Sequence, residues 1–195
     1  MSYHSPIVLH HCCSIDIEKP ISIKGENTGS QYDSQKHIYK VQNKIILRAN
    51  GRKYRLEEYH FHIPCEHVLN NTIYPAEIHY VFYEIGDYQP HDSSDPHKYH
   101  SCCDDSGEKN ILVIGRVISS LKSHQREPVD LSRFPIDIPN CYYEYDGSLT
   151  TGNFAPVRWL VGNDPLRIDI EQLLHVSKPA RPVQDLNGRI ILYST

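Results

Sequence analysis

A short run in which two histidines alternate with two aromatic residues constrains most what this chain can fold into. His60 and His62 alternate there with Tyr59 and Phe61. Side chains two residues apart point to the same face of an extended strand, whereas on a helix they point about 200° apart. We therefore interpret the run as a strand that presents both imidazoles on one face.

The run 76–83 has the same character, because it is rich in β-branched and aromatic residues. Alternation sends Glu77 and His79 to one face of this second strand. If the two strands are antiparallel neighbours, the imidazoles of His60, His62 and His79 converge on one point.

Three neutral imidazoles can hold a zinc ion and leave its fourth tetrahedral position open for water, which is the arrangement of a catalytic site. Two partly buried strand histidines with ordinary hydrogen bonds would give the same spacing, so His60 and His62 alone do not define a metal site. Carboxylates favour the metal, since Glu58 shares a face with these two histidines and Glu77 shares one with His79. Metal-bound histidines commonly donate their second N–H to a carboxylate, which fixes the tautomer. The sequence therefore predicts a zinc site.

Length and charge exclude other classes of protein. The 195 residues suit one domain over 1–195, and the formal net charge of −4 argues against a nucleic-acid partner. We find no apolar run near the roughly 18 residues of a membrane span, and no secretory signal at residues 1–9. We therefore expect a cytoplasmic protein; its oligomeric state stays open.

Six cysteines occur: the adjacent pairs Cys12-Cys13 and Cys102-Cys103, and the single Cys65 and Cys141. Disulfide frameworks belong mainly to small secreted domains. We therefore favour reduced thiols, although the redox state of the two adjacent pairs stays open.

The remaining pattern is dominated by strands and turns. We expect sheet edges and turns over 5–24, two short strands with a hairpin over 38–50, a strand buried on both faces over 111–118, strands over 157–161 and 189–193, and short helices over 119–125 and 170–174. Asn50-Gly51 is a hairpin signal before the first histidine strand, and 69–72 forms a turn before the second. The fold class is mainly β (α+β), with few, short helices.

The polar segment 88–109 is expected to be a surface excursion. Its histidines and cysteines could be taken for a second metal site; they are His91, His97, His100, Cys102 and Cys103. Their spacing matches no closed zinc pattern, so we do not predict one there.

Several motifs together resemble the α-class carbonic anhydrases in their short, bacterial-type form. They are Tyr59–His67, Tyr74–His79, Tyr145–Thr151, Val157–Val161 and Arg181–Arg189, with Ser5–Ile7 near the start. The resemblance implies a single large, twisted, mostly antiparallel sheet with zinc at the base of a conical cleft. It also implies a lyase that interconverts carbon dioxide and bicarbonate, releasing a proton, by means of a zinc-bound hydroxide.

The resemblance also implies roles for individual residues. Thr150, followed by Thr151, matches a gatekeeper that accepts a hydrogen bond from the hydroxide and donates its own to Glu66. An apolar pocket for carbon dioxide is implied at Val81, Val113, Leu149, Val157 and Trp159. Taken singly, these five would be interpreted as core residues, and Glu66 as a surface acid.

The sequence departs from the family pattern at several of these places. Glu58 stands at the position of a glutamine, and Ser30 at that of the proton-shuttle histidine, for which His37 is a rival. Serine does not titrate near pH 7. Gly152-Asn153 replaces two prolines in a loop one residue shorter.

Two other functions stay open. One is a non-catalytic, carbonic-anhydrase-related binding or adsorption protein, although such proteins usually lose a zinc histidine and this chain keeps all three. The other is a structural metalloprotein whose cleft the shortened loop closes.

Overall fold

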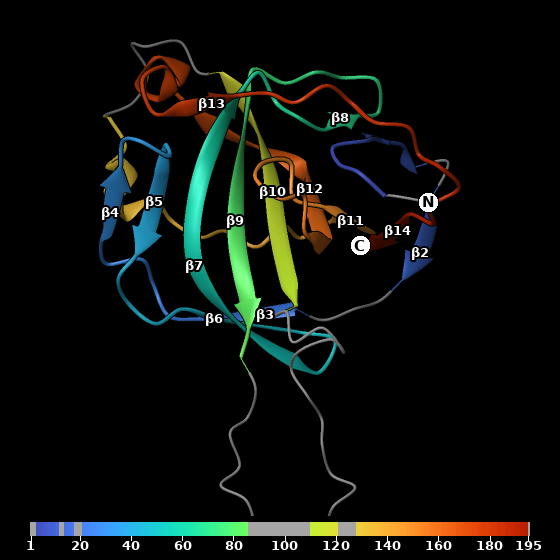
Figure 1. Ribbon diagram of the computed structural model, residues 1–195, viewed down its shortest axis with the longest axis horizontal. Helices are drawn as coiled ribbons and strands as arrows, with labels where there is room; N and C mark the ends of the chain where they lie inside the picture. Colours follow the sequence, from blue (N-terminus) through green and yellow to red (C-terminus); the bar gives the residue numbers. More distant parts are fainter. Residues whose placement is uncertain (1–2, 12–13, 18–20, 86–109, 121–127, 195) are drawn as a thin grey trace, which may run out of the picture.

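A computed structural model of the protein describes residues 3–11, 14–17, 21–85, 110–120 and 128–194 (Figure 1). Its strands are Val8–Leu9 (β1), Ile15–Ile17 (β2), Ile21–Lys24 (β3), Ser30–Asp33 (β4), Ile38–Val41 (β5), Ile46–Ala49 (β6), Arg52–Ile63 (β7), Val68–Leu69 (β8), Ala76–Glu84 (β9), Ile111–Ser120 (β10), Tyr142–Ser148 (β11), Pro156–Ile168 (β12), Ser177–Pro179 (β13) and Leu192–Ser194 (β14). Two short 3-10 helices are described, Leu131–Arg133 (η2) and Ile170–Leu173 (η3).

Twelve of these strands form one sheet. Its main path runs β2-β14-β11-β12-β10-β9-β7-β5-β4. Off this path, β6 and β13 pair with β7 and β3 pairs with β6, while β1 and β8 form a separate pair. Most neighbours are antiparallel, but β10 and β12 are parallel. Figure 1 shows the long strands β7, β9 and β10 curving side by side through the centre of the molecule. The predicted mainly β fold class, with a large, mostly antiparallel sheet and few, short helices, is confirmed.

The strands β7 and β9 are antiparallel neighbours, which is the condition for the three imidazoles to converge. His60 lies opposite His79, and His62 opposite Glu77. The hairpin signal at Asn50-Gly51 is also confirmed, because it joins β6 to β7 and both residues adopt positive φ.

The two faces of the central strands bury different clusters. Tyr59 and Phe61 lie in the larger cluster, which also holds Tyr39 and Phe82. The opposite face, which carries the histidines, packs around a second cluster that includes Trp159. Alternation along β7 thus separates an aromatic core from the face that bears the imidazoles.

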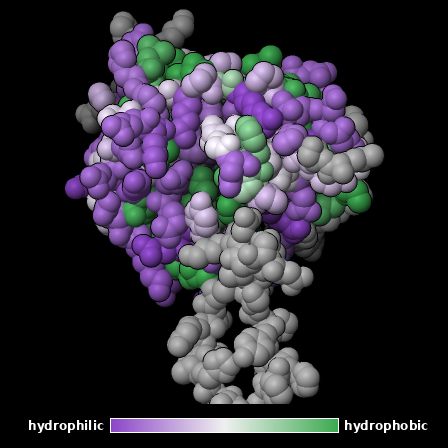
Figure 2. Space-filling view, in the orientation of Figure 1, coloured by the Kyte–Doolittle hydropathy of each residue, from purple (hydrophilic) through white to green (hydrophobic). Residues whose placement is uncertain are grey.

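The outer surface is more polar than these clusters. Figure 2 shows one face of the molecule that is mainly hydrophilic, with apolar side chains in smaller groups. Among the described residues, no helix is long and apolar enough to span a membrane.

Other predicted elements are confirmed in part. The strand predicted over 111–118 is β10, buried along nearly its whole length, and the short helix expected over 170–174 is η3. The strand expected over 157–161 forms part of the longer β12. The segment 88–109 lies outside the described residues.

Three details of the prediction were wrong. The strands over 38–50 do not pair with each other as a hairpin, because β5 and β6 each pair with β7 on either side of an irregularity in its register. A helix does not begin at 119, since Ser119 and Ser120 continue the pairing of β10 with β12; the positions from 121 to 125 lie outside the described residues. The strand expected over 189–193 begins only at Leu192, after a turn.

Candidate metal centre

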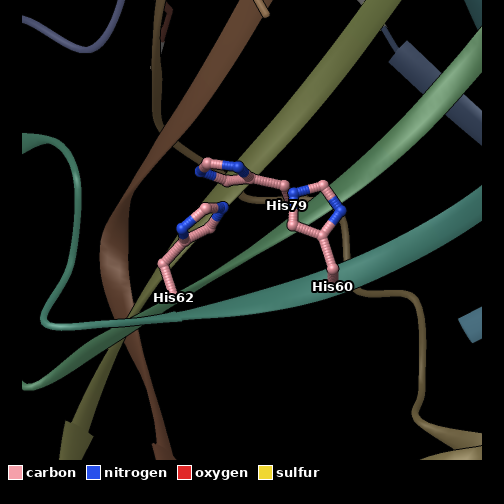
Figure 3. Close-up of side chains that lie close together, drawn as sticks. All are labelled: His60, His62 and His79. Carbon is pink, nitrogen blue, oxygen red and sulfur yellow. The ribbon is translucent and has the colours of Figure 1, made fainter. Parts of the chain in front are cut away.

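Three imidazoles from two neighbouring strands face one another (Figure 3). His60 and His62 project from β7 and His79 from β9, with ring centroids 4.7 to 5.4 Å apart. One nitrogen of each ring lies within 4.8 Å of a nitrogen of the other two. This spacing allows the three rings to share one metal ion.

The nitrogen of each ring that points away from this centre has an oxygen nearby. Nδ1 of His62 lies 3.2 Å from the carbonyl oxygen of Pro179, and Nε2 of His79 lies 3.1 Å from Glu77 Oε1. Nδ1 of His60 lies 3.9 Å from Glu58 Oε1. Protons on these outer nitrogens leave lone pairs on His60 Nε2, His62 Nε2 and His79 Nδ1.

Burial keeps two of these histidines neutral. Burial, followed by the charge of Lys178, holds the pKa of His60 well below its usual value. Burial, followed by the neighbouring His79, lowers the pKa of His62 to about 3. Nε2 of His62 is buried without a hydrogen-bond partner among the described residues. A buried, unpaired and neutral imidazole nitrogen costs free energy that a metal ion would recover, so the residues fit zinc.

Glu77 organises the layer behind the histidines. Its Oε1 lies 2.7 Å from Nδ1 of His67, and its Oε2 accepts hydrogen bonds from the backbone N–H groups of Glu66 and His67, both at 2.9 Å. Burial by itself raises the pKa of Glu77, but its electrostatic interactions and hydrogen bonds with His67 and His79 hold it well below its usual value. An ionised Glu77 therefore orients His79.

A longer buried chain of hydrogen bonds continues from His67. Its Nε2 lies 2.6 Å from the hydroxyl of Tyr145, which donates to Ser5 Oγ at 3.1 Å. Ser5 Oγ also accepts from the N–H of Ser148, so the network ties the start of the chain to the end of β11. His67 and Tyr145 were not predicted as positioning residues, although both stand inside the motifs Tyr59–His67 and Tyr145–Thr151.

The chain also matches a protein-family model. The model describes eukaryotic-type carbonic anhydrases and matches residues 9–195. The chain belongs to this family. Curated carbonic anhydrases share moderate identity with it: Nec1 of Nesocodon mauritianus is 28% identical over 222 residues, covering 90% of this chain and 71% of that protein. A carbonic anhydrase of Neisseria gonorrhoeae is 29% identical over 189 residues, covering 89% of this chain and 68% of that protein.

Solved structures show the carbonic anhydrase fold as well. An α-carbonic anhydrase from Thermovibrio ammonificans, in complex with sulfanilamide, superposes with a TM-score of 0.71 at 22% identity over 97% of this chain and 86% of that chain. The structure of dioscorin complexed with ascorbate superposes with a TM-score of 0.70 at 18% identity, over 98% of this chain and 85% of that chain.

Of the two gatekeeper residues expected for this family, Glu66 is the better defined. It is 1% exposed, and its Oε1 accepts a hydrogen bond from the backbone N–H of Arg181 at 2.8 Å. The interpretation of Glu66 as a surface acid, which its local sequence alone would favour, is therefore wrong. Its Oε2 has no hydrogen-bond partner, and no hydrogen bond joins it to the buried Thr150 among the described residues. A Thr150–Glu66 bond therefore stays a prediction.

The apolar residues predicted to line a carbonic anhydrase pocket form one cluster. Val81, Val113, Val157 and Trp159 are buried in it, with Leu149 packed against it at partial exposure. The Trp159 ring touches that of His79, with centroids 4.8 Å apart. The cluster therefore forms an apolar wall beside the histidines.

The two proton-shuttle candidates are bonded elsewhere. The Ser30 hydroxyl donates to Asn27 Oδ1 at 3.1 Å. His37 Nδ1 lies 2.9 Å from the hydroxyl of Tyr32, whose ring packs on Tyr39 of the aromatic core. Among the described residues, no hydrogen bond or ion pair joins either side chain to the three histidines.

Proposed function

We propose that this protein catalyses the reversible hydration of carbon dioxide to bicarbonate and a proton at a zinc ion held by His60, His62 and His79. The observation that carries the proposal is the convergence of three buried imidazoles whose outer nitrogens each lie near an oxygen. When bound, zinc lowers the pKa of a coordinated water, as is established for carbonic anhydrases in general.

The residues around the ion carry the remaining work. The wall of Val113, Val157 and Trp159 excludes water and suits an apolar, uncharged substrate such as carbon dioxide. Thr150 orients the reacting oxygen by accepting its hydrogen bond. The buried Glu66 has a free oxygen for the Thr150 hydroxyl, and an ionised carboxylate can only accept. Thr151 is the next residue after Thr150 and is exposed.

The outer carboxylates hold the ligands in place. Glu77, with Oε1 3.1 Å from Nε2 of His79, fixes the tautomer of that ligand, whereas Glu58, 3.9 Å from Nδ1 of His60, acts on His60 through its charge. A negative charge at Glu58 strengthens both imidazole and zinc binding, and it makes a coordinated water less acidic than a neutral amide would.

Zinc content and carbon dioxide hydration test the proposal together. We expect one zinc per chain and stopped-flow hydration that a chelator abolishes and zinc restores. His79→Ala should lose both zinc and activity, whereas the exposed His175→Ala should keep both. Bound zinc without hydration would overturn the catalytic proposal and favour a binding or structural protein on this fold. Tight zinc in His79→Ala would overturn the ligand set.

A further inference from the structure

A hollow of about 470 Å³ lies on the Glu58 side of the candidate metal centre. Its lining consists of Lys36, Ile38, Lys40, Glu58, Thr151, Gly152 and Lys178. Glu58 connects it to the metal centre, because its Oε1 lies 3.9 Å from Nδ1 of His60. Thr151 connects it to the loop that carries Thr150. A ligand in the hollow would therefore sit next to the reaction site without occupying a metal position.

The hollow carries more positive than negative charge. Three lysines and one glutamate line it, in a protein whose formal net charge is −4. The charges of Lys178, Lys36 and Lys40 all act on the Glu58 carboxylate, so the four groups share one electrostatic environment. Asp33 forms an ion pair with Lys40 at 3.6 Å. Three lysines against the two carboxylates of Glu58 and Asp33 still leave a net positive charge.

Lys178 occupies the most enclosed position of the three lysines. The parallel pairing of β13 with β7 sets it opposite His62, where its side chain is half-buried, while Lys36 and Lys40 are exposed. A half-buried ammonium group has lost part of its water and gains more from an anionic partner than an exposed one. Lys40 shares a face of β5 with Ile38, whereas Lys36 lines the hollow from the turn that precedes β5.

We propose that this hollow binds a small oxyanion, and that bicarbonate is its occupant during catalysis. The choice of bicarbonate rests on the proposed function, because hydration of carbon dioxide forms this anion a short distance away. Several ammonium groups suit a planar oxyanion, since each offers N–H donors to its oxygens. Inorganic phosphate shares this chemistry and is the rival source.

The test uses metal-free, ¹⁵N-labelled protein, so that zinc does not compete for the anion. Sodium bicarbonate and inorganic phosphate are titrated separately at constant ionic strength, with chloride as the reference, while the amide resonances of Thr151, Gly152 and Lys178 are followed. We expect saturable shifts with bicarbonate that weaken as salt is raised, because salt screens exposed charges.

Variants assign the binding to the lysines. Lys178→Gln and Lys40→Gln should each weaken bicarbonate binding about fivefold, the effect of removing one charge about 4 Å away in water. Lys178→Arg keeps the charge and should retain most of the affinity. The exposed Lys24→Gln on β3 is the matched control and should bind as the wild type does.

Each outcome decides the proposal. Shifts no larger than those with chloride, or equal affinity in the lysine variants, would overturn it. Saturation by phosphate but not by bicarbonate would overturn the assignment to bicarbonate. Because binding is measured without zinc, a protein that binds bicarbonate but fails to hydrate carbon dioxide would refute the proposed function and leave this site standing.

Discussion

Glu77 and His67 form a buried pair in which Oε1 lies 2.7 Å from Nδ1. The same oxygen lies 3.1 Å from Nε2 of His79, so one carboxylate links a non-ligand histidine to a predicted zinc ligand. The buried hydrogen bonds that hold Glu77 in place therefore also hold the ring of His79 in place.

Replacing this carboxylate should weaken the metal centre. Glu77→Gln removes the charge that fixes the tautomer of His79 and raises its basicity, so we expect zinc affinity to fall about 10- to 100-fold. Competition with a chromophoric chelator measures this. The exposed Glu26→Gln is the control. An unchanged affinity in Glu77→Gln would contradict the role assigned to this carboxylate.

Thr150→Ala should separate chemistry from metal binding. We expect zinc to remain bound while hydration falls about 10²- to 10³-fold, a loss typical of one positioning hydrogen bond. Stopped-flow hydration and metal analysis of the same sample check this, with the exposed Thr28→Ala as control. Hydration at the wild-type rate would rule out Thr150 as gatekeeper.

Gly115 leaves space that the carboxylate of Glu77 needs. It lies opposite His79 in the sheet, and a Cβ atom there would meet Glu77 Oε1 at 2.8 Å. We expect Gly115→Ala to cost about 1–3 kcal/mol of unfolding free energy and to lower zinc affinity. A Cβ at Gly29 meets nothing within 4 Å, so Gly29→Ala should change neither property. Denaturant titration with zinc analysis compares the two, and equal behaviour would refute the packing argument.

Proton release should depend on buffer. None of the residues that line the hollow beside the metal centre is a histidine, and His37 is bonded to Tyr32. We therefore expect turnover to rise as an imidazole-type buffer is added, because a titratable relay near pH 7 is needed. His37→Ala should leave that dependence unchanged. Fast, buffer-independent turnover in the wild type would contradict this.

Alkaline pH should destabilise the protein through buried acids. Burial raises the pKa of Tyr39 from 10.0 to about 12, and that of the Cys65 thiol from 9.0 to about 12. An acid whose pKa is raised by folding binds its proton more tightly in the folded state. Its stabilising effect is thus complete below the unfolded pKa and is lost as pH rises towards the folded one.

We therefore expect the free energy of unfolding to decline from about pH 9 upwards, measured by denaturant titration between neutral and alkaline pH. Tyr39→Phe should make the decline shallower, while Tyr3→Phe, at a side chain 45% exposed, should not. The same slope in both variants would remove Tyr39 from the explanation.

Local pattern alone determined the strands that carry the predicted ligands. In β7 and β9, alternation decides which face each side chain takes, since the backbone geometry of a strand allows only two. The order of residues therefore assigned His60 and His62 to one face of β7, and His79 joined them once β7 and β9 paired as antiparallel neighbours. Asn50-Gly51 was equally predictable, because few residue pairs accept the positive φ that this turn requires.

Tertiary structure alone decided what surrounds those ligands. Pro179 accepts from His62 across 117 residues of sequence, and Ser5 meets Ser148 across 143. The pairing partners of β5 and β6 were misassigned for the same reason, and Lys178 carried no signal of its place beside Glu58. Strand alternation constrains only near neighbours, whereas the pairing of distant strands depends on how the whole sheet packs its two buried clusters.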